Sequence, residues 1–325
     1  MTAKDRVYWL VSPARLRRVD NSLRVEREDG SEVRIPITDV ADIVACAPLD
    51  VNTAVVGLLA EHGVDVHVLG YYGDYKGGVL PAQRQVSGDL VVRQALASVG
   101  DEALGIAKEV VLAAGFNTRR VVGRDALEPA WETFREAVGS AGDREALMGA
   151  EGVFRRSAWE AVDARLPEEL QLSGRSRRPP RNAGNAFISY VNGIVYSRCV
   201  GAIRLTGLHT GIGFLHSTMS RSRHTLALDL AELFKPLFAE RLLLRLGSRG
   251  ELGAKDFDQR VAEASLSDAG KRKVVAAVRD ELESKVHHRG LGRRVSYDEL
   301  LHLEALKLVR WLMLGDRYKA LRVWW

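Results

Sequence analysis

The chain has 325 residues, 46% of them hydrophobic and 27% charged, with 47 basic and 42 acidic side chains and a net charge of +5. This length predicts two domains, and the composition is that of an ordinary globular protein whose weak positive charge is compatible with nucleic acid without establishing it. No apolar run reaches membrane-spanning length and the N-terminus lacks the apolar region of a signal peptide, so we expect a cytoplasmic protein that binds no membrane. Cys46 and Cys199 lie far apart in the chain, and buried free thiols in a reducing cytosol are expected.

Residues 1–82 are expected to form a mostly β N-terminal domain. The alternating segments Ser22–Glu28 and Glu32–Ile37 flank the turn residues Asp29 and Gly30, which predicts a hairpin. Further strands, one short helix and a glycine-rich hairpin follow at Asp42–Ala47, Thr53–Glu61 (stopped by Gly63), Val64–Leu69 and Tyr71–Val79. One helix among several strands cannot supply a doubly wound parallel sheet.

From Ser87 onward the apolar residues recur with a period of 3.6, which predicts an all-α C-terminal domain over residues 88–325 and an α+β fold for the chain. The expected helices are Leu90–Val99, Glu102–Arg124, Pro129–Val138, Arg144–Arg165, Asn182–Leu205, Thr225–Leu246, Asp256–Lys285 and Tyr297–Leu314. The segment Leu172–Arg181 is a basic loop whose prolines prevent a continuous helix.

The chemistry is concentrated in Gly207–Glu240. His216 ends a short apolar segment, and Asp229 and Glu232, three residues apart on the following helix, lie on one face. One imidazole nitrogen and two carboxylates suit Mg²⁺ or Mn²⁺. The nearby cations Arg221, Arg223 and Lys235 are what a phosphate substrate would need. This pattern predicts a metal-dependent enzyme that acts on nucleic acid.

Simpler interpretations remain open for each residue. A histidine beside apolar residues is more often a core residue, and two helical carboxylates are more often a solvated face. A metal would also need a further ligand, which spacing cannot select. Glu240 lies about 16 Å beyond Asp229 by the helical rise, so we expect a structural role or a bond to a neighbouring cation. Pro236 should kink or break the helix.

Two basic segments could contact nucleic acid. The loop arginines are the best phosphate contacts by composition, with a solvated surface loop as the alternative: Arg175, Arg177, Arg178 and Arg181. The terminal Trp324 and Trp325 could stack on bases, but a hydrophobic tail docked on the core is the stronger expectation.

In order and spacing, several short segments resemble one family, the CRISPR-associated adaptation integrase and endonuclease, in the version of type I (I-B-like) systems. These segments are Arg17–Arg24, Ile35–Ile37, Val64–Tyr72, Gly77–Pro81, Val86–Gln94, Glu151–Gly152 with Arg155 and Arg156, Asn185–Tyr196, Gly213–His216 and Leu226–Pro236. The family commonly has Asp-Pro where this chain has His209-Thr210, so His209 is not taken for a ligand.

The resemblance implies a site and a reaction. Glu151, His216 and Glu232 would hold the metal, Asp229 would be a neighbouring carboxylate, and Tyr196 would lie at the scissile phosphate or in the core. A 3′-hydroxyl of spacer-precursor DNA would attack a phosphodiester at the CRISPR repeat by transesterification. The implied assembly is a homodimer, with the N-terminal domain in dimerisation and partner contact, bridged by a small ferredoxin-like partner protein. A non-catalytic DNA-end-binding scaffold and a phosphohydrolase of small nucleotides are the alternatives.

Overall fold

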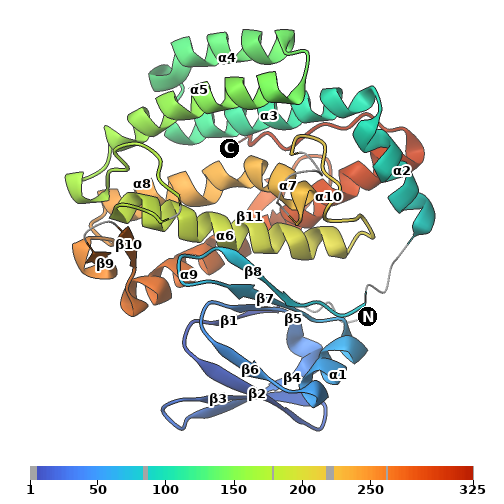
Figure 1. Ribbon diagram of the computed structural model, residues 1–325, viewed down its shortest axis with the longest axis vertical. Helices are drawn as coiled ribbons and strands as arrows, with labels where there is room; N and C mark the ends of the chain where they lie inside the picture. The colour runs from blue at the N-terminus through green and yellow to red at the C-terminus, as the bar shows by residue number, and fades with distance from the viewer. Residues whose placement is uncertain (1–5, 83–86, 178, 217–222, 261–262, 325) are drawn as a thin grey trace.

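The computed structural model describes residues 6–82, 87–177, 179–216, 223–260 and 263–324. A β-rich N-terminal region lies against a larger, mainly helical C-terminal region (Figure 1). The α+β fold class expected from the sequence is therefore confirmed.

Within the described residues, the N-terminal region has two four-stranded sheets, one α-helix and a short 3-10 helix at Ile37–Asp39. The first sheet has the order β1-β5-β7-β8 and the second the order β4-β3-β2-β6. Their elements are β1 (Arg6–Leu10), β2 (Ala14–Val19), β3 (Ser22–Arg27), β4 (Glu32–Pro36), β5 (Val40–Ala45), β6 (Leu49–Val51), α1 (Thr53–His62), β7 (Asp65–Leu69) and β8 (Tyr75–Val79). The predicted hairpin is β3–β4, and α1 ends at Gly63, whose φ of 60° is left-handed as a helix C-cap requires.

Parallel and antiparallel pairs are mixed in these sheets. β1, β5 and β7 pair in parallel, and the connection from β5 to β7 runs through β6 of the second sheet and then α1. β8 then pairs antiparallel with β7, so the segment Tyr71–Val79 supplies the turn and one strand of a hairpin, and the other strand is β7 rather than part of the same segment. A separate apolar cluster fills this region, with Leu16, Leu23 and Leu58 among its fully buried members.

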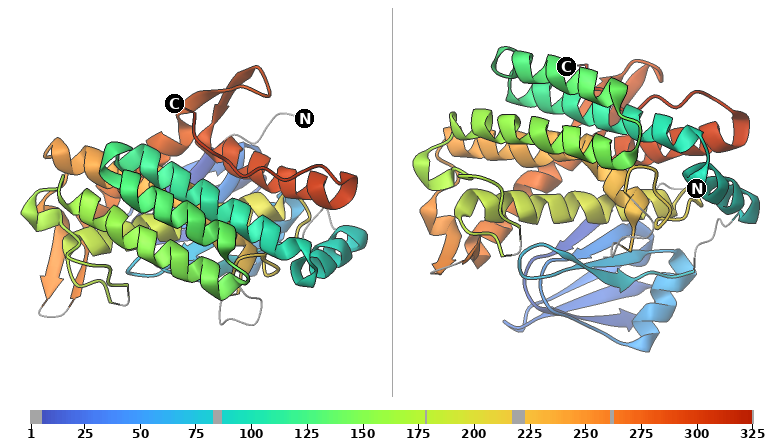
Figure 2. Two further views of the ribbon diagram at one scale, coloured as in Figure 1. Left: turned by 90° about the horizontal axis from the view of Figure 1, so that it is seen from above. Right: turned by 45° about the horizontal axis from the view of Figure 1, so that its top comes forward.

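The C-terminal region is built in layers on the first sheet. α6 contacts β7 and β8, α7 packs on α6, α3 packs on α7, and α5 and α4 pack beyond α3 (Figures 1 and 2). The helices are α2 (Gly88–Val99), α3 (Glu102–Val122), α4 (Glu128–Ser140), α5 (Arg144–Asp163), α6 (Ala183–Arg204), α7 (Thr225–Lys235), α8 (Arg241–Ser248), α9 (Asp268–Glu283) and α10 (Tyr297–Leu314). α6 is long and apolar enough to span a membrane by composition, but 78% of its apolar window is buried within the fold, as expected of a core helix.

Two predictions about the helices have different outcomes. Pro236 ends the regular α-helix, as expected: α7 stops at Lys235, and Pro236–Glu240 is a π-helix that leads into α8. The predicted helix Asp256–Lys285 is wrong in its first third, where β9 (Phe257–Arg260) and β10 (Glu263–Leu266) form a hairpin. A second hairpin, β11 (Lys285–His288) with β12 (Arg293–Ser296), precedes α10. The region is largely helical rather than purely helical.

The two regions interlock through the turn between β7 and β8. Gly73, with a φ of 81°, lies against α6 so closely that a Cβ there would come 2.4 Å from the Cα of Tyr190. A Cβ on Gly193 of α6 would come 1.7 Å from the carbonyl oxygen of Gly73. Only glycines allow this approach of two backbones, so the glycine-rich turn serves packing. Cys46 and Cys199 are buried free thiols, as expected.

Candidate metal centre

Asp229 fixes the orientation of His216. Its Oδ1 accepts hydrogen bonds from the His216 backbone N–H (2.9 Å) and pairs with the ring Nδ1 (2.7 Å), while Oδ2 accepts from the N–H groups of Phe214 and Leu215. Asp229 itself is buried. A carboxylate on Nδ1 leaves Nε2 as the ring nitrogen that could bind a metal, which is the usual arrangement around histidine ligands.

The segment before His216 is held by contacts from two helices. The Thr225 hydroxyl accepts from Gly213 N–H at 2.9 Å and donates to the Gly211 carbonyl at 2.8 Å. From α2, the buried Gln94 amide donates to the carbonyls of His209 (2.9 Å) and Ile212 (2.7 Å), and its Oε1 accepts from His209 N–H. In the sequence, Gln94 stands out only as the last residue of the family segment Val86–Gln94, and spacing does not reveal its role, because its partners lie more than 110 residues away.

The pKa values of Glu232 and Glu151 are shifted in opposite directions. Burial would raise the pKa of Glu232, but Lys235, His216 and Arg155 outweigh it and lower the pKa to about 2. Lys235 forms an ion pair with the Glu232 carboxylate. Burial, and then the charge of Glu232, raises the pKa of Glu151 to about 7. The two carboxylates on α5 and α7 therefore repel each other, and a divalent cation between them would relieve that repulsion.

His216 responds to the same charges. Burial alone would lower the pKa of His216, but the hydrogen bond and charge of Asp229, with the charge of Glu232, raise it above its usual value. Glu151, His216, Asp229 and Glu232 thus form one electrostatic group, drawn from α5, the segment Gly213–His216 and α7. Reasoning from residues alone reached three of these four, and Glu151 entered only through the family resemblance.

Glu240 forms an ion pair with the Arg155 side chain, which is one of the two roles expected for it. Its side chain is fully buried and its Oε1 lies 2.6 Å from Nη2 of Arg155 on α5. The guanidinium of Arg155 also packs on Trp159. This pairing makes Glu240 part of the support of the site.

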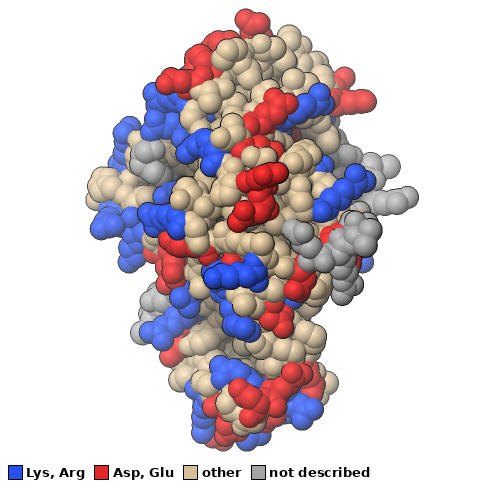
Figure 3. Space-filling view, turned by 90° about the vertical axis from the view of Figure 1, so that its left-hand side faces the viewer, with Lys and Arg blue, Asp and Glu red and all other residues tan. Residues whose placement is uncertain are grey.

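The predicted DNA-contacting arginines separate into three groups. Arg175 is half-buried and committed to the fold, because it donates to Asn185 Oδ1 (2.9 Å) and Ser189 Oγ (3.0 Å). Arg177, Arg181 and Arg223 are exposed. Arg178 and Arg221 lie outside the described residues. On the face shown in Figure 3, basic and acidic side chains are interspersed, so the weak net charge does not form one continuous basic surface there.

Tyr196 has structural partners. Its hydroxyl donates to the backbone carbonyl of His224 at 3.4 Å, and its ring packs edge-on against Tyr75 of the N-terminal region. Burial raises the pKa of Tyr196 to about 12, so it stays protonated. The C-terminal tail is also docked: Trp324 Nε1 donates to the His287 carbonyl at 3.1 Å, while Trp325 lies outside the described residues.

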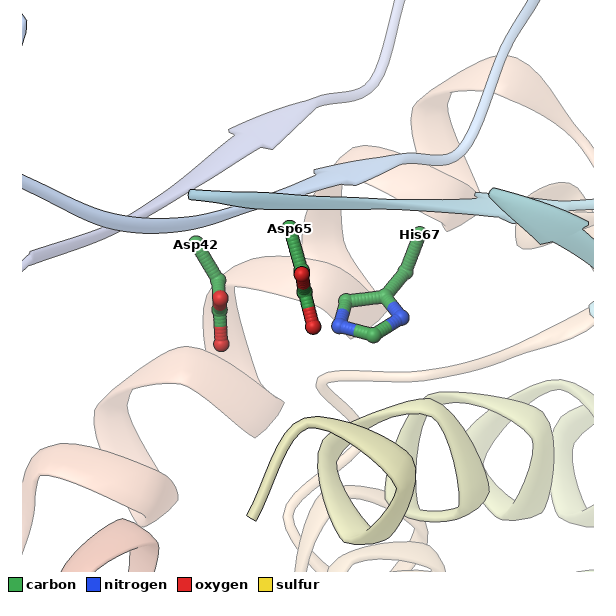
Figure 4. A group of neighbouring side chains, drawn as sticks. All are labelled: Asp42, Asp65 and His67. Atoms are coloured by element: carbon green, nitrogen blue, oxygen red, sulfur yellow. The ribbon is translucent and has the colours of Figure 1, made fainter. Parts of the chain in front are cut away.

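A second group of possible metal ligands lies between the two regions. Within the described ranges, Asp42, Asp65 and His67 are the residues whose ligand atoms lie within 4.8 Å of one another. They project from β5 and β7 toward the same side (Figure 4). His67 is fully buried, and burial followed by the charge of Arg198 lowers its pKa to about 3, so the ring is neutral.

Arginines from α6 already neutralise this second group. Arg198 Nη1 lies 2.6 Å from Asp42 Oδ2, and Arg204 Nε lies 2.6 Å from Asp65 Oδ2. A Cβ added to Gly201 would lie 3.1 Å from Asp42 Oδ2 and 3.2 Å from His67 Nε2, which shows how closely α6 covers both atoms. These contacts favour an ion-pair network that joins the two regions over a metal site.

Comparison with known proteins identifies the family. The model of the family described as CRISPR associated protein Cas1 matches residues 7–280. The chain belongs to the Cas1 family. Among its relatives, the CRISPR-associated endonuclease Cas1 2 of Moorella thermoacetica is 35% identical over 98% of this chain and 100% of its own length. The CRISPR-associated endonuclease Cas1 of Haloferax volcanii is 33% identical over 98% of both chains.

Solved structures agree with this membership. A Cas1 protein from Thermotoga maritima superposes with a TM-score of 0.87 at 28% identity, covering 98% of this chain and 100% of that protein. A casposase bound to its integration product has a TM-score of 0.86 at 21% identity, covering 97% of this chain and 93% of the casposase, and it shows that the fold is shared. Cas1 membership supports a CRISPR adaptation nuclease and integrase.

Proposed function

We propose that this chain is a divalent-metal-dependent DNA endonuclease and integrase, which inserts new spacers into a CRISPR array by transesterification. The attacking group is a 3′-hydroxyl of the spacer precursor, and the bond broken is a phosphodiester at the repeat. The observation that carries the proposal is His216, whose Nδ1 is fixed on the buried Asp229 carboxylate beside Glu151 and Glu232. A protein that only captures DNA ends needs no histidine oriented in this way.

The chemistry of this donor set suits a divalent cation. Glu151, Glu232 and His216 Nε2 would hold it, a mixed oxygen and nitrogen set that suits Mg²⁺ or Mn²⁺. When bound, the cation would neutralise charge on the transferring phosphoryl group and stabilise the leaving 3′-oxygen. Asp229 keeps the imidazole in one orientation, and Lys235 keeps Glu232 ionised.

DNA binding and assembly belong to the same proposal. Arg177, Arg181 and Arg223 are exposed and available for phosphate contacts, whereas Arg175 supports the loop that carries two of them. Structures with this fold include a casposase bound to integration product and a complex that contains Cas1 and Cas2. By analogy, we propose a homodimer organised by residues 1–82, a small ferredoxin-like partner, and catalysis within residues 88–325.

The decisive experiment is strand transfer on a branched DNA that resembles a half-integrated spacer. The full chain would be compared with Glu151→Ala and His216→Ala in Mg²⁺, Mn²⁺ or chelator, with Glu160→Ala, an exposed glutamate of the same helix, as the matched control. We expect metal-dependent resealing that both ligand variants lose and the control keeps, with DNA binding retained throughout. A wild type that binds the branch and never reseals it would support the scaffold alternative.

A further inference from the structure

Arg155 and Glu240 form a buried ion pair next to the proposed ligands. The Arg155 side chain is 16% exposed and that of Glu240 is 0% exposed, and their closest atoms are 2.6 Å apart. Arg155 Cζ lies 4.3 Å from the ring centroid of Trp159, and Nη1 donates to Thr118 Oγ1 at 3.2 Å. A guanidinium with a carboxylate, an aromatic face and a hydroxyl around it is held in one orientation.

Each member of the pair follows one proposed ligand along the chain, on the same side of the helix or near it. Arg155 is four residues after Glu151 on α5, so both project from one face. Glu240 is eight residues after Glu232, which in a regular α-helix would place them about 80° apart around the axis. The π-helix Pro236–Glu240 turns less per residue than an α-helix, and this brings Glu240 closer to the face of Glu232.

The pair therefore connects the two elements that carry the carboxylates. α5 and α7 both pack on α3, and the ion pair of Arg155 with Glu240 is a direct side-chain link between α5 and the π-helix that follows α7. The positive charge of Arg155 also favours the ionised forms of Glu151 and Glu232. π-helical insertions are uncommon and often occur at functional sites, which agrees with a role beyond packing.

We propose that Arg155 is a positioning residue that acts through Glu240 to set the separation and shared charge of Glu151 and Glu232, so that together they accept one divalent cation. This inference rests on the proposed metal site. The direction of the change in metal affinity distinguishes this role from that of a bystander. By Coulomb's law a nearby guanidinium opposes the binding of another cation, so removing a bystander Arg155 would strengthen metal binding, whereas removing a positioning Arg155 weakens it.

The test measures Mn²⁺ binding to the full chain by titration calorimetry. We expect Arg155→Met to raise the Kd for Mn²⁺ at least tenfold, Arg155→Lys to lie closer to the wild type, and Arg156→Met, at an exposed position on the same helix, to leave the Kd unchanged. The double variant Arg155→Met with Glu240→Met covers the case in which the single variant does not fold, because it leaves no unpaired buried charge. The double variant also keeps the net charge, so the expected tenfold loss of Mn²⁺ affinity reports on the geometry of the site.

The outcomes are separable. Unchanged or tighter Mn²⁺ binding by the folded double variant overturns the positioning role while the metal site stands. If the wild type binds no Mn²⁺, or if Glu151→Gln binds it as the wild type does, the proposed function fails and this inference fails with it. A higher Kd for Mn²⁺ in both Arg155→Met and the double variant, with the near-ultraviolet circular dichroism unchanged, supports the positioning role.

Discussion

Replacing Asp229 by asparagine changes one buried group and preserves its shape. Each carboxylate oxygen of Asp229 accepts from two N–H groups in this structure, counting Nδ1 of His216. In the variant one of these oxygens becomes an NH₂ that faces two donors. Hydrogen bonds to a charged acceptor contribute about 1.5–3 kcal/mol each, so losing two costs about 3–6 kcal/mol of a total stability of about 5–15 kcal/mol.

The same change should act on the imidazole. Asp229 raises the pKa of His216 against the effect of burial, so the variant should have a lower His216 pKa. Denaturant unfolding measures the first effect and nitrogen NMR of the imidazole measures the second, with Asp101→Asn as a control because this exposed side chain caps no helix. If Asp229→Asn unfolds at the wild-type denaturant concentration and His216 titrates as before, the proposed role of Asp229 is refuted.

Five further results are expected. Because the pKa of His216 is raised in the fold, its protonation stabilises the metal-free protein fully below the unfolded value near 6.5, and this stability is lost as pH rises through the raised pKa; denaturant midpoints across pH 5–8 measure it. Affinity for Mn²⁺ should rise over the same interval, since the ligand must lose its proton, and calorimetry that shows no pH dependence would contradict His216 as a ligand. Gln94→Leu leaves two part-buried carbonyls and one part-buried N–H without their partner and should lower stability by about 1–3 kcal/mol, while exposed Arg93→Ala should not. Arg198→Met should cost about 3–5 kcal/mol and Arg198→Met with Asp42→Leu much less, and Mn²⁺ or Zn²⁺ should not stabilise a chain that carries Glu151→Gln and His216→Ala if Asp42, Asp65 and His67 hold no metal.

Local sequence patterns correctly predicted the features that depend on residues close together in the chain. The hairpin β3–β4 follows from alternation around Asp29-Gly30, and the break at Pro236 follows from the missing N–H of proline. Asp229 and Glu232 share α7, so their three-residue spacing predicted that they act together. Lys235, one turn later, pairs with Glu232 for the same reason.

Tertiary contacts explain what the sequence did not reveal. The segment 257–266 forms β9 and β10 because these four-residue strands pair with each other, and β10 packs on α6. A periodicity window cannot detect such packing, which overrides local helix preference. The ion pairs Arg198–Asp42 and Arg204–Asp65 join residues 156 and 139 positions apart. Their signals in the sequence are single charged residues without a pattern.

The proposed ligands are supported by contacts that involve no metal. Asp229 holds His216, Gln94 and Thr225 hold the segment before it, and Arg155 with Glu240 links the helices of the two glutamates. Lys235 compensates the charge of Glu232. Contacts that hold these side chains without a metal reduce the reorganisation needed when charge develops on the substrate. The loss of activity expected for Glu151→Ala should therefore occur in a folded protein that still binds DNA.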